Sequence, residues 1–300
     1  MESGLHRRPK WPEAAGMSLA ALLLLQEDRA EAGAALARRL GIDCIEAAPL
    51  TGARGRRYRE FVASHLGPPP CQLLEWGPDG LALVRIEPRQ ILTVRADFTA
   101  PAVDFRRRQG GRRSEGIARA VGLRAGQLPP VLDATAGLGG DAFVLAALGC
   151  EVTLLERVPA LQELLADALL RAHSEAAARQ DSELKAALDR MHLVRSEATA
   201  YLAPLPDASR PEVIYLDPMF PERRKSAAVK KDMQLLHHLV GSDADADQLL
   251  PIALHVARRR VVVKRPRQAE PLGGRRPEHV IEGVRNRYDL YQPVGLPNPK

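Results

Sequence analysis

The sequence predicts an α/β protein, in which a small α+β domain precedes a larger domain built on a doubly wound, mostly parallel sheet. Three observations carry this prediction. Apolar strand-length segments alternate with helix-length segments after residue 116, a glycine-rich turn follows the first of these strands, and a later strand ends in Asp-Pro. Strand–helix alternation of this kind is typical of parallel sheets covered by helices.

The first third of the chain has a different order of segments. Residues 1–16 are rich in basic residues and proline, and we expect a disordered leader there, followed by a domain over residues 17–95. Within that domain, Gly77-Pro78-Asp79-Gly80 has the composition of a turn between two short strands. The expected elements of this domain are strands at 19–25, 44–47, 72–76 and 81–86, a helix at 29–40 and a polar loop at 52–58.

The second domain is expected over residues 96–300. It begins with an Arg- and Gly-rich stretch, 96–116, which we interpret as a linker. Strands and Ala- and Leu-rich helices then alternate, and a hairpin comes last. The expected strands are 131–134, 151–156, 192–195, 213–217 and 260–264, the hairpin strands are 279–284 and 287–292, and the expected helices are 141–148, 159–173, 182–191 and 246–257.

Composition and cysteine use exclude several classes of protein. Apolar residues make up 45% of the chain and charged residues 27%, which is a globular composition. The three cysteines lie far apart without Cys-x-x-Cys spacing, which argues against a disulfide framework or structural zinc and suits a reducing cytoplasm. The apolar run Leu19–Leu25 is far shorter than the roughly 20 residues of a membrane span. We therefore expect a soluble, cytoplasmic protein without a membrane segment.

A metal site is not expected either. Asp243, Asp245 and Asp247 resemble the start of a calcium-binding loop, but Gln248 stands at the position where such a loop needs glycine. These acids are better interpreted as residues at the start of a helix.

The densest local signal is the segment Val131–Asp141, in which an apolar strand ends at Asp133, a turn contains Gly137, Gly139 and Gly140, and a helix opens at Asp141. Glycines let the backbone approach a ligand, and the start of a helix offers unpaired N–H groups. The spacing also fits the dinucleotide fingerprint, so the turn alone leaves a nicotinamide cofactor open.

Acidic residues around this turn favour S-adenosylmethionine. Asp133 and Asp141 suit a cationic ligand that carries an amino acid better than they suit a pyrophosphate. Glu156 ends the next strand, 17 residues after Gly139, where a carboxylate can accept hydrogen bonds from both ribose hydroxyls. Ser196-Glu197, at the end of the third strand, falls where methyltransferases of the Rossmann type contact adenine.

The second strong signal is Glu212–Phe220, in which a buried strand delivers Asp217-Pro218-Met219-Phe220 to its carboxyl end. An exocyclic base amine is a poor nucleophile because its lone pair is delocalised into the ring. The Asp217 carboxylate and the Pro218 carbonyl can accept the two hydrogens of such an amine and favour the transition state. The ring of Phe220 can stack on an extruded base. We therefore predict Asp217, Pro218 and Phe220 as the reaction centre.

Positive charge is concentrated in three segments. Residues 103–124 carry a net +5, residues 222–231 a net +4 and residues 258–287 a net +7, although the whole chain carries only +6. Such concentration suits a polyanionic partner, and Arg-rich solvated faces are the alternative.

Taken together, these motifs resemble the RsmJ family of bacterial 16S ribosomal RNA guanine-N2 methyltransferases. The segments that carry the resemblance are 133–148, 155–157, 215–221, 225–231 and 261–266. The resemblance implies a Rossmann-like class I methyltransferase sheet, S-adenosylmethionine as cofactor and the small ribosomal subunit or its RNA as partner. It adds Arg157 to the expected cofactor contacts and places Gly140, Asp141, Glu156, Ser196, Glu197 and Asp217 among them.

The basic segments then acquire an expected role in RNA binding through phosphate contacts. The residues expected in this role are Arg106, Arg107, Arg108, Arg112, Arg113, Arg223, Arg224, Lys225, Lys230, Lys231, Lys264 and Arg265. Two alternatives stay open: an amino-methyltransferase acting on DNA adenine or a protein amide, and a catalytically silent RNA-binding assembly factor.

Overall fold

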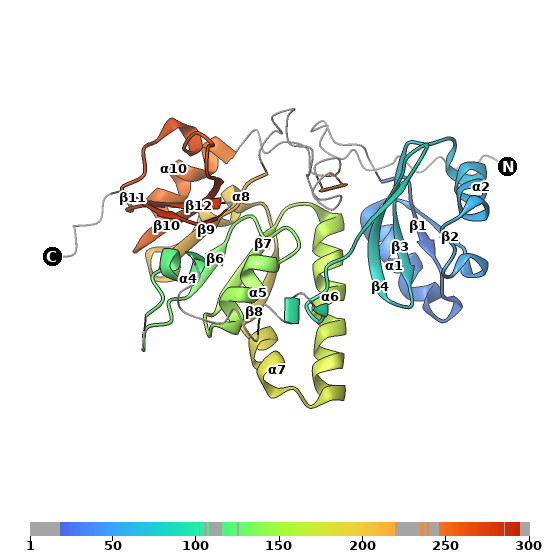
Figure 1. Ribbon diagram of the computed structural model, residues 1–300, viewed down its shortest axis with the longest axis horizontal. Helices are drawn as coiled ribbons and strands as arrows, with labels where there is room; N and C mark the ends of the chain where they lie inside the picture. The colour runs from blue at the N-terminus through green and yellow to red at the C-terminus, as the bar shows by residue number, and fades with distance from the viewer. Residues whose placement is uncertain are drawn as a thin grey trace. The chain divides into compact units, whose positions relative to one another are not determined.

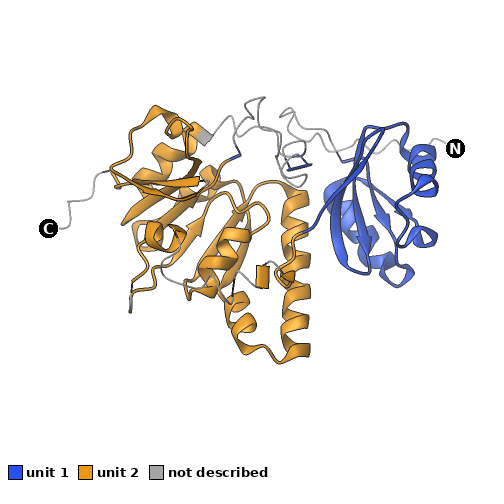
Figure 2. Cartoon of the chain, viewed as in Figure 1, with its two compact units in different colours: residues 1–95, 219–242 blue, residues 96–218, 243–300 orange. Residues whose placement is uncertain are grey.

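The computed structural model of the chain describes residues 19–101, 103–104, 107, 116–124, 126–219, 235–236, 239, 246–284 and 286–294. By its internal contacts the chain forms two compact units, residues 1–95 with 219–242 and residues 96–218 with 243–300 (Figure 2).

The first unit contains a five-stranded sheet in the order β2-β1-β3-β4-β5. β1 runs parallel to β2 and β3, whereas β3, β4 and β5 form an antiparallel meander. The strands are β1 (Ala21–Leu24), β2 (Asp43–Glu46), β3 (Cys71–Gly77), β4 (Gly80–Ile86) and β5 (Ile91–Val94), and the helices are α1 (Ala30–Leu40) and α2 (Arg56–Leu66).

The expected loop at 52–58 is wrong in its second half, because α2 begins at Arg56. Tyr58 and Val62 lie one helical turn apart and are both buried against the sheet, in a cluster with Leu73 and Val84. The four predicted strands and the helix at 29–40 are confirmed, and β5 is an element that the sequence pattern did not reveal.

The second unit contains a seven-stranded sheet in the order β11-β12-β10-β9-β6-β7-β8 (Figure 1). β12 is antiparallel to both of its neighbours, and the remaining pairings are parallel. The strands are β6 (Val131–Asp133), β7 (Val152–Glu156), β8 (Met191–Arg195), β9 (Val213–Leu216), β10 (Arg260–Pro266), β11 (His279–Glu282) and β12 (Asn286–Tyr291). The predicted strands and the hairpin are thus confirmed.

Helices cover this sheet as expected for a doubly wound fold. The core of the unit joins apolar residues of four helices, α4 to α7, to the strands, whereas α8 packs on α10 and α10 on β10. The helices are α4 (Gly116–Val121), α5 (Gly140–Ala147), α6 (Pro159–Arg179), α7 (Ser182–Asp189), α8 (Ala198–Leu202) and α10 (Ala246–Val256). Among the described residues, none of the helices has both the length and the apolar character that crossing a membrane requires.

The stretch interpreted as a linker, 96–116, is packed at its start. Ala96 and Phe98 are buried in the core of the second unit, and the Phe98 ring stacks on Phe143 with 5.1 Å between ring centroids. The linker interpretation is therefore wrong for these residues, because apolar burial fixes them to the sheet domain.

The order of the strands shows at which edge of the sheet a ligand is expected to bind. From β6 the chain moves outward through β7 to β8, then returns to the other side of β6 with β9 and β10. β6 and β9 are parallel neighbours where this reversal occurs. Ligands of such sheets bind beyond the carboxyl ends of the strands at this switch point, which is where Asp133 and Asp217 lie.

Candidate active site

Four ionisable side chains lie at the carboxyl edge of the second sheet, each in or directly after a different strand. Asp133 ends β6, Glu156 ends β7, Asp217 directly follows β9, and Lys264 lies in β10. The sequence predicted the three acids as site residues, and the structure brings them to one edge of one sheet.

The glycine turn between β6 and α5 is closely packed at Gly139 and open at Gly140. Gly139 has a φ of 74°, and a Cβ there would lie 2.8 Å from Leu165 Cδ2, so a larger residue would require both strain and displacement. A Cβ at Gly140 would meet nothing within 4 Å. The turn therefore presents exposed backbone beside the start of α5, as a bound cofactor requires.

Glu156 ties this turn to the end of β7. Its Oε2 accepts the Gly137 N–H at 2.9 Å, and its Oε1 accepts the Val158 N–H at 2.7 Å. The side chain is 6% exposed. Both carboxylate oxygens thus hold backbone next to the glycine turn, where further lone pairs suit the ribose hydroxyls of a nucleoside.

Replacing Glu156 by glutamine should weaken binding of S-adenosylhomocysteine by about 10- to 100-fold, because the amide NH₂ would face one of the two backbone donors. Isothermal titration calorimetry measures this affinity. Glu151→Gln is the matched control, since Glu151 immediately precedes β7 at its opposite end and its side chain is 60% exposed. Equal affinities for the two variants would contradict the assigned position of Glu156 in the cofactor site.

Lys264 bridges two carboxylates at the switch point. Its Nζ donates to Asp141 Oδ2 at 2.7 Å and to Asp217 Oδ2 at 2.8 Å. Burial alone would lower the pKa of Lys264, but the Asp217 and Asp141 carboxylates outweigh burial and raise the pKa. Lys264 is therefore charged at neutral pH and fixes Asp217 against the start of α5.

One further hydrogen bond holds Asp217 directly, and another holds Asp141, with which Asp217 shares Lys264. The Asp217 N–H donates to Thr135 Oγ1 at 2.6 Å, and the Tyr215 hydroxyl donates to Asp141 Oδ2 at 2.7 Å. Burial and the neighbouring carboxylates hold the pKa of Tyr215 well above its usual value, so the hydroxyl stays a donor. Sequence reasoning missed Tyr215, Thr135 and the bridging role of Lys264. Thr135 lies inside the glycine motif, and its hydroxyl was the available signal.

Asp133 occupies the most buried position of the cluster, 2% exposed, and its Oδ1 accepts the Thr135 N–H at 3.1 Å. Burial raises the pKa of Asp133 to about 8; the hydrogen bond from Thr135 opposes this shift, and the Asp141 and Asp217 carboxylates add to it. The carboxyl is therefore mainly neutral at pH 7. It can donate as well as accept a hydrogen bond towards the glycine turn.

This raised pKa predicts a decline of stability with pH. Between about pH 4, where an unfolded Asp releases its proton, and about pH 8, the folded protein holds a proton that the unfolded chain has lost. The free energy of unfolding falls with rising pH across this window, by up to about 1.4 kcal/mol per pH unit, and levels off above it. Asp133→Asn should flatten that decline, which urea unfolding at pH 5, 6, 7 and 8 measures. Parallel profiles for the two proteins would contradict the neutral carboxyl.

At the end of the third strand, the structure gives Glu197 a local role. Its two carboxylate oxygens accept the Thr199 and Ala200 N–H groups at 2.8 and 2.7 Å, so Glu197 caps α8. The Ser196 hydroxyl donates to the Glu197 carbonyl at 3.1 Å. Arg157 follows β7 and is half-buried. Their contacts to adenine and ribose remain predictions.

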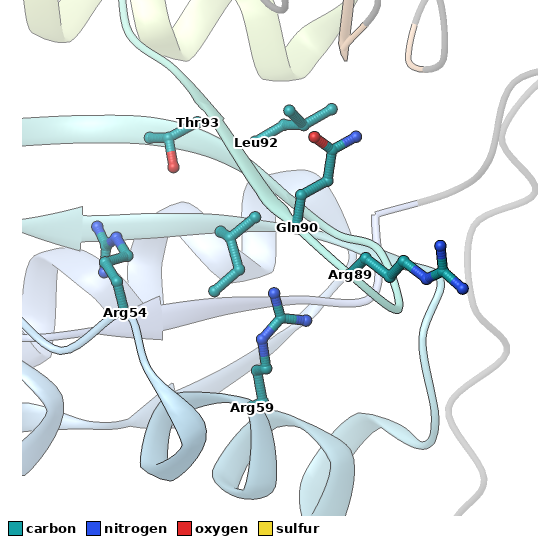
Figure 3. A pocket seen from close by; sticks show the side chains of 7 residues that line it. Arg54, Arg59, Arg89, Gln90, Leu92 and Thr93 are labelled. Carbon is teal, nitrogen blue, oxygen red and sulfur yellow. The ribbon is translucent and has the colours of Figure 1, made fainter.

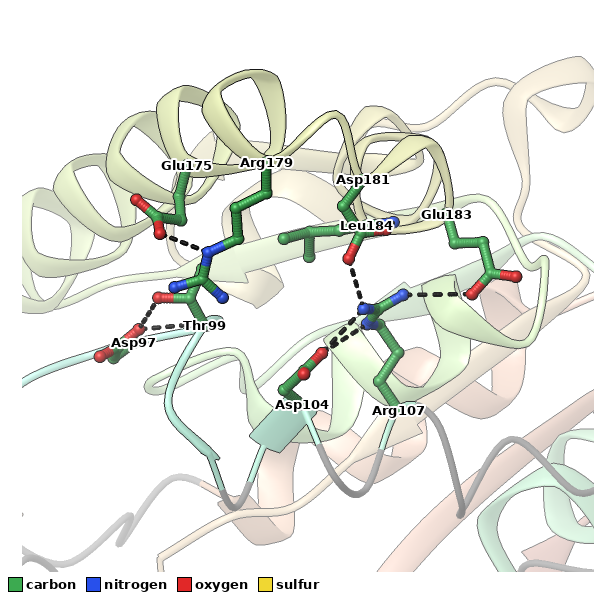
Figure 4. A network of polar contacts seen from close by, with 9 residues as sticks. All are labelled: Asp97, Thr99, Asp104, Arg107, Glu175, Arg179, Asp181, Glu183 and Leu184. Carbon is green, nitrogen blue, oxygen red and sulfur yellow. Dashed lines mark hydrogen bonds and ion pairs between the residues drawn. The ribbon is translucent and has the colours of Figure 1, made fainter.

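Three of the basic residues expected at RNA have intramolecular roles. Arg107 is 9% exposed and pairs with Asp104, Asp181 and Glu183 at 2.8, 2.7 and 3.4 Å (Figure 4). Lys264 lies in the carboxylate bridge, and Arg265 is buried and donates to the Glu270 carbonyl. The phosphate role of these three stays a prediction that their surroundings disfavour. Arg107 and Lys264 are paired with carboxylates of the chain, and Arg265 is only 7% exposed.

The other expected RNA contacts and the stacking ring lie outside the described residues. They are Arg106, Arg108, Arg112, Arg113, Phe220, Arg223, Arg224, Lys225, Lys230 and Lys231. Within the described part of the chain, no three His, Cys, Asp or Glu side chains are grouped to hold a metal ion.

The chain is similar to known methyltransferases in sequence and in fold. The family model described as "Putative SAM-dependent methyltransferase" matches residues 67–293. The ribosomal RNA small subunit methyltransferase J of Cellvibrio japonicus is 52% identical over 73% of this chain and 82% of its own length. The protein of that name from Edwardsiella ictaluri is 42% identical over 92% of this chain and 100% of its own.

A solved structure extends the similarity to the fold. The SAM-dependent methyltransferase from Neisseria gonorrhoeae is 32% identical, with a TM-score of 0.64, and the match covers 93% of this chain and 98% of that protein. At this level both the sequence pattern and the arrangement of elements are shared.

Proposed function

Because this chain belongs to the ribosomal RNA small subunit methyltransferase J family of S-adenosylmethionine-dependent methyltransferases, we propose that it methylates the exocyclic N2 amine of a guanine in 16S ribosomal RNA. The observation that carries the amine target is the Asp217-Pro218 pair at the switch point, with Asp217 held by Lys264 through its side chain and by Thr135 through its N–H.

The residues of the edge fit the cofactor of the family. The open backbone at Gly140 and the Glu156 carboxylate beside Gly137 would hold S-adenosylmethionine, with Arg157, Ser196 and Glu197 as further proposed contacts. When bound, the cofactor supplies a methyl group on a sulfonium, which is already an activated donor.

The residues of the chain orient the amine. One Asp217 carboxylate oxygen and the Pro218 carbonyl accept its two hydrogens, which become more acidic in the transition state, so these bonds strengthen as the reaction proceeds. Lys264 and Thr135 keep Asp217 from turning away, which preserves the alignment. Phe220, two residues beyond Pro218, is proposed to stack on the extruded base. Asp217 accepts the proton that the amine loses.

The RNA itself is proposed to be held by the basic residues outside the described ranges, with Arg107, Lys264 and Arg265 removed from that set. Phosphate contacts release counterions, so affinity for RNA should fall steeply between low and moderate salt. A ribosomal RNA substrate supports a cytoplasmic location for the protein, which we propose as well.

Tritium transfer from labelled S-adenosylmethionine tests the proposal. Small subunits or 16S RNA from cells that lack this methylation should accept label, and mass mapping of the digested RNA should find N2-methylguanosine at one nucleotide. Label in DNA adenine would favour the alternative amino-methyltransferase. RNA binding without any transfer would favour a catalytically silent assembly factor.

A further inference from the structure

The first unit holds a cavity of about 560 Å³ whose lining includes three arginines from three separate segments (Figure 3). Arg54 comes from the loop before α2, Arg59 from α2 itself, and Arg89 from the turn between β4 and β5. The remaining lining residues are Gln90, Ile91, Leu92 and Thr93, so none of the described carboxylates lines the cavity. None of these arginines belongs to the three basic segments that the sequence singled out.

The arginines are held in place by different partners. Arg54 donates to both oxygens of the buried Glu75 carboxylate, which offsets its charge. Arg59 Nη1 donates to the Glu87 carbonyl at 2.7 Å, a neutral partner that leaves the positive charge uncompensated.

Arg89 lies at the tip of a closed hairpin turn, where the Glu87 N–H donates to the Gln90 carbonyl at 2.9 Å. Within the described residues Arg89 makes no hydrogen bond or ion pair. Among the described residues, the cavity therefore has two cations without a carboxylate partner, Arg59 on α2 and Arg89 in the turn.

We propose that this cavity binds a phosphodiester segment of the RNA substrate, an inference that rests on the proposed function. Guanidinium groups match phosphate oxygens in charge and geometry, and a cavity without carboxylates does not suit a cation. Its volume falls in the range of about 300–1,000 Å³ that holds a small organic ligand, so it accommodates a nucleotide unit with its ribose. Thr93 and Gln90 add polar groups for a ribose hydroxyl or a phosphate oxygen.

Arg56 provides a matched control from the same helix. It forms an ion pair with Glu60 at 2.6 Å, its side chain is 91% exposed, and it is absent from the cavity lining. Arg56→Gln therefore removes the same charge from the same unit without changing the cavity.

The test compares Arg59→Gln/Arg89→Gln, Arg89→Gln alone and Arg56→Gln in the full chain. Filter binding to undermethylated small subunits should show about 5- to 20-fold weaker affinity for the double variant and a salt slope reduced by about 1 to 2. The single variant should show part of this loss. The KM for RNA should rise, while kcat at saturating RNA and the affinity for S-adenosylhomocysteine stay at wild-type values.

Unchanged RNA affinity in both cavity variants, or an equal loss in Arg56→Gln, would overturn the inference. Titration with inorganic phosphate separates the sources of the ligand: phosphate binding lost in the variants without any change in RNA affinity would identify a site for small anions instead. These outcomes can be distinguished from a failure of the proposed function, because in that case the wild-type protein would transfer no methyl group to RNA.

Discussion

Asp217→Ala is expected to lower kcat for methyl transfer by at least about 10²-fold, since removing one preorganised partner of a transition state typically costs about 10²–10³. The reason is positional as well as electrostatic. The carboxylate follows β9 at the switch point, where Lys264 fixes Oδ2 at 2.8 Å and Thr135 fixes the backbone N–H at 2.6 Å. Binding of S-adenosylhomocysteine should weaken only a few-fold, because Glu156 and the glycine turn are unchanged.

Two further variants make this result specific. Asp217→Asn keeps an acceptor oxygen but loses the charge, so it can align the amine but cannot accept its proton. A rate between those of the wild type and Asp217→Ala would show that both roles contribute. Asp207→Ala removes an Asp with an 88% exposed side chain from the same unit and should leave the rate unchanged. A folded Asp217→Ala protein with wild-type transfer would exclude Asp217 from the reaction centre.

Local patterns in the sequence were sufficient to predict most of the second unit. β6 and β7 are short apolar runs, each followed by a helix-length segment, and this rhythm depends only on neighbours in the chain. The glycine turn, Glu156 and Asp217 were identifiable for the same reason, since each stands at a strand end. Helix α2 was not predicted, because its start at Arg56 is rich in arginine and its burial depends on a sheet formed by distant residues.

Contacts between distant segments explain what the sequence did not reveal in the site. Lys264 is 47 residues from Asp217 and 123 from Asp141, and these groups come together because β10 pairs with β9 and β9 with β6. The density of positive charge along the sequence has a similar limit. It cannot distinguish Arg107, whose partners Asp181 and Glu183 lie more than 70 residues away, from an arginine that faces solvent.

Lys264→Met is expected to lower the free energy of unfolding by about 2–3 kcal/mol, below the range of about 3–5 kcal/mol for breaking a fully buried ion pair. The smaller value reflects solvent at the site, since the Asp217 side chain is 37% exposed, whereas those of Asp141 and Lys264 are 14% and 19% exposed. The substitution leaves two carboxylates facing each other without their shared cation. Urea unfolding measures the loss.

The pH dependence of this loss follows from the raised pKa of Lys264. A cation whose folded pKa lies above its unfolded value of about 10.4 contributes fully below that value and loses its contribution only as pH rises through the folded pKa. The deficit of Lys264→Met should therefore stay constant between about pH 6 and 7, below the pKa of about 8 of Asp133, which Lys264 helps to lower. Lys264→Arg keeps the cation and should recover part of the stability.

Lys185→Met tests whether the loss depends on the place of the lysine at the switch point. Lys185 pairs with Asp189 at 2.6 Å on the surface of α7 and its side chain is 62% exposed, so its replacement should cost less than about 0.5 kcal/mol. Methyl transfer should fall in Lys264→Met and persist in Lys185→Met, because only Lys264 orients Asp217. If the two variants lose equal stability and equal activity, the carboxylate bridge does not organise the site. If Lys264→Met loses stability but keeps full kcat, the bridge supports the fold alone and Asp217 is aligned through Thr135.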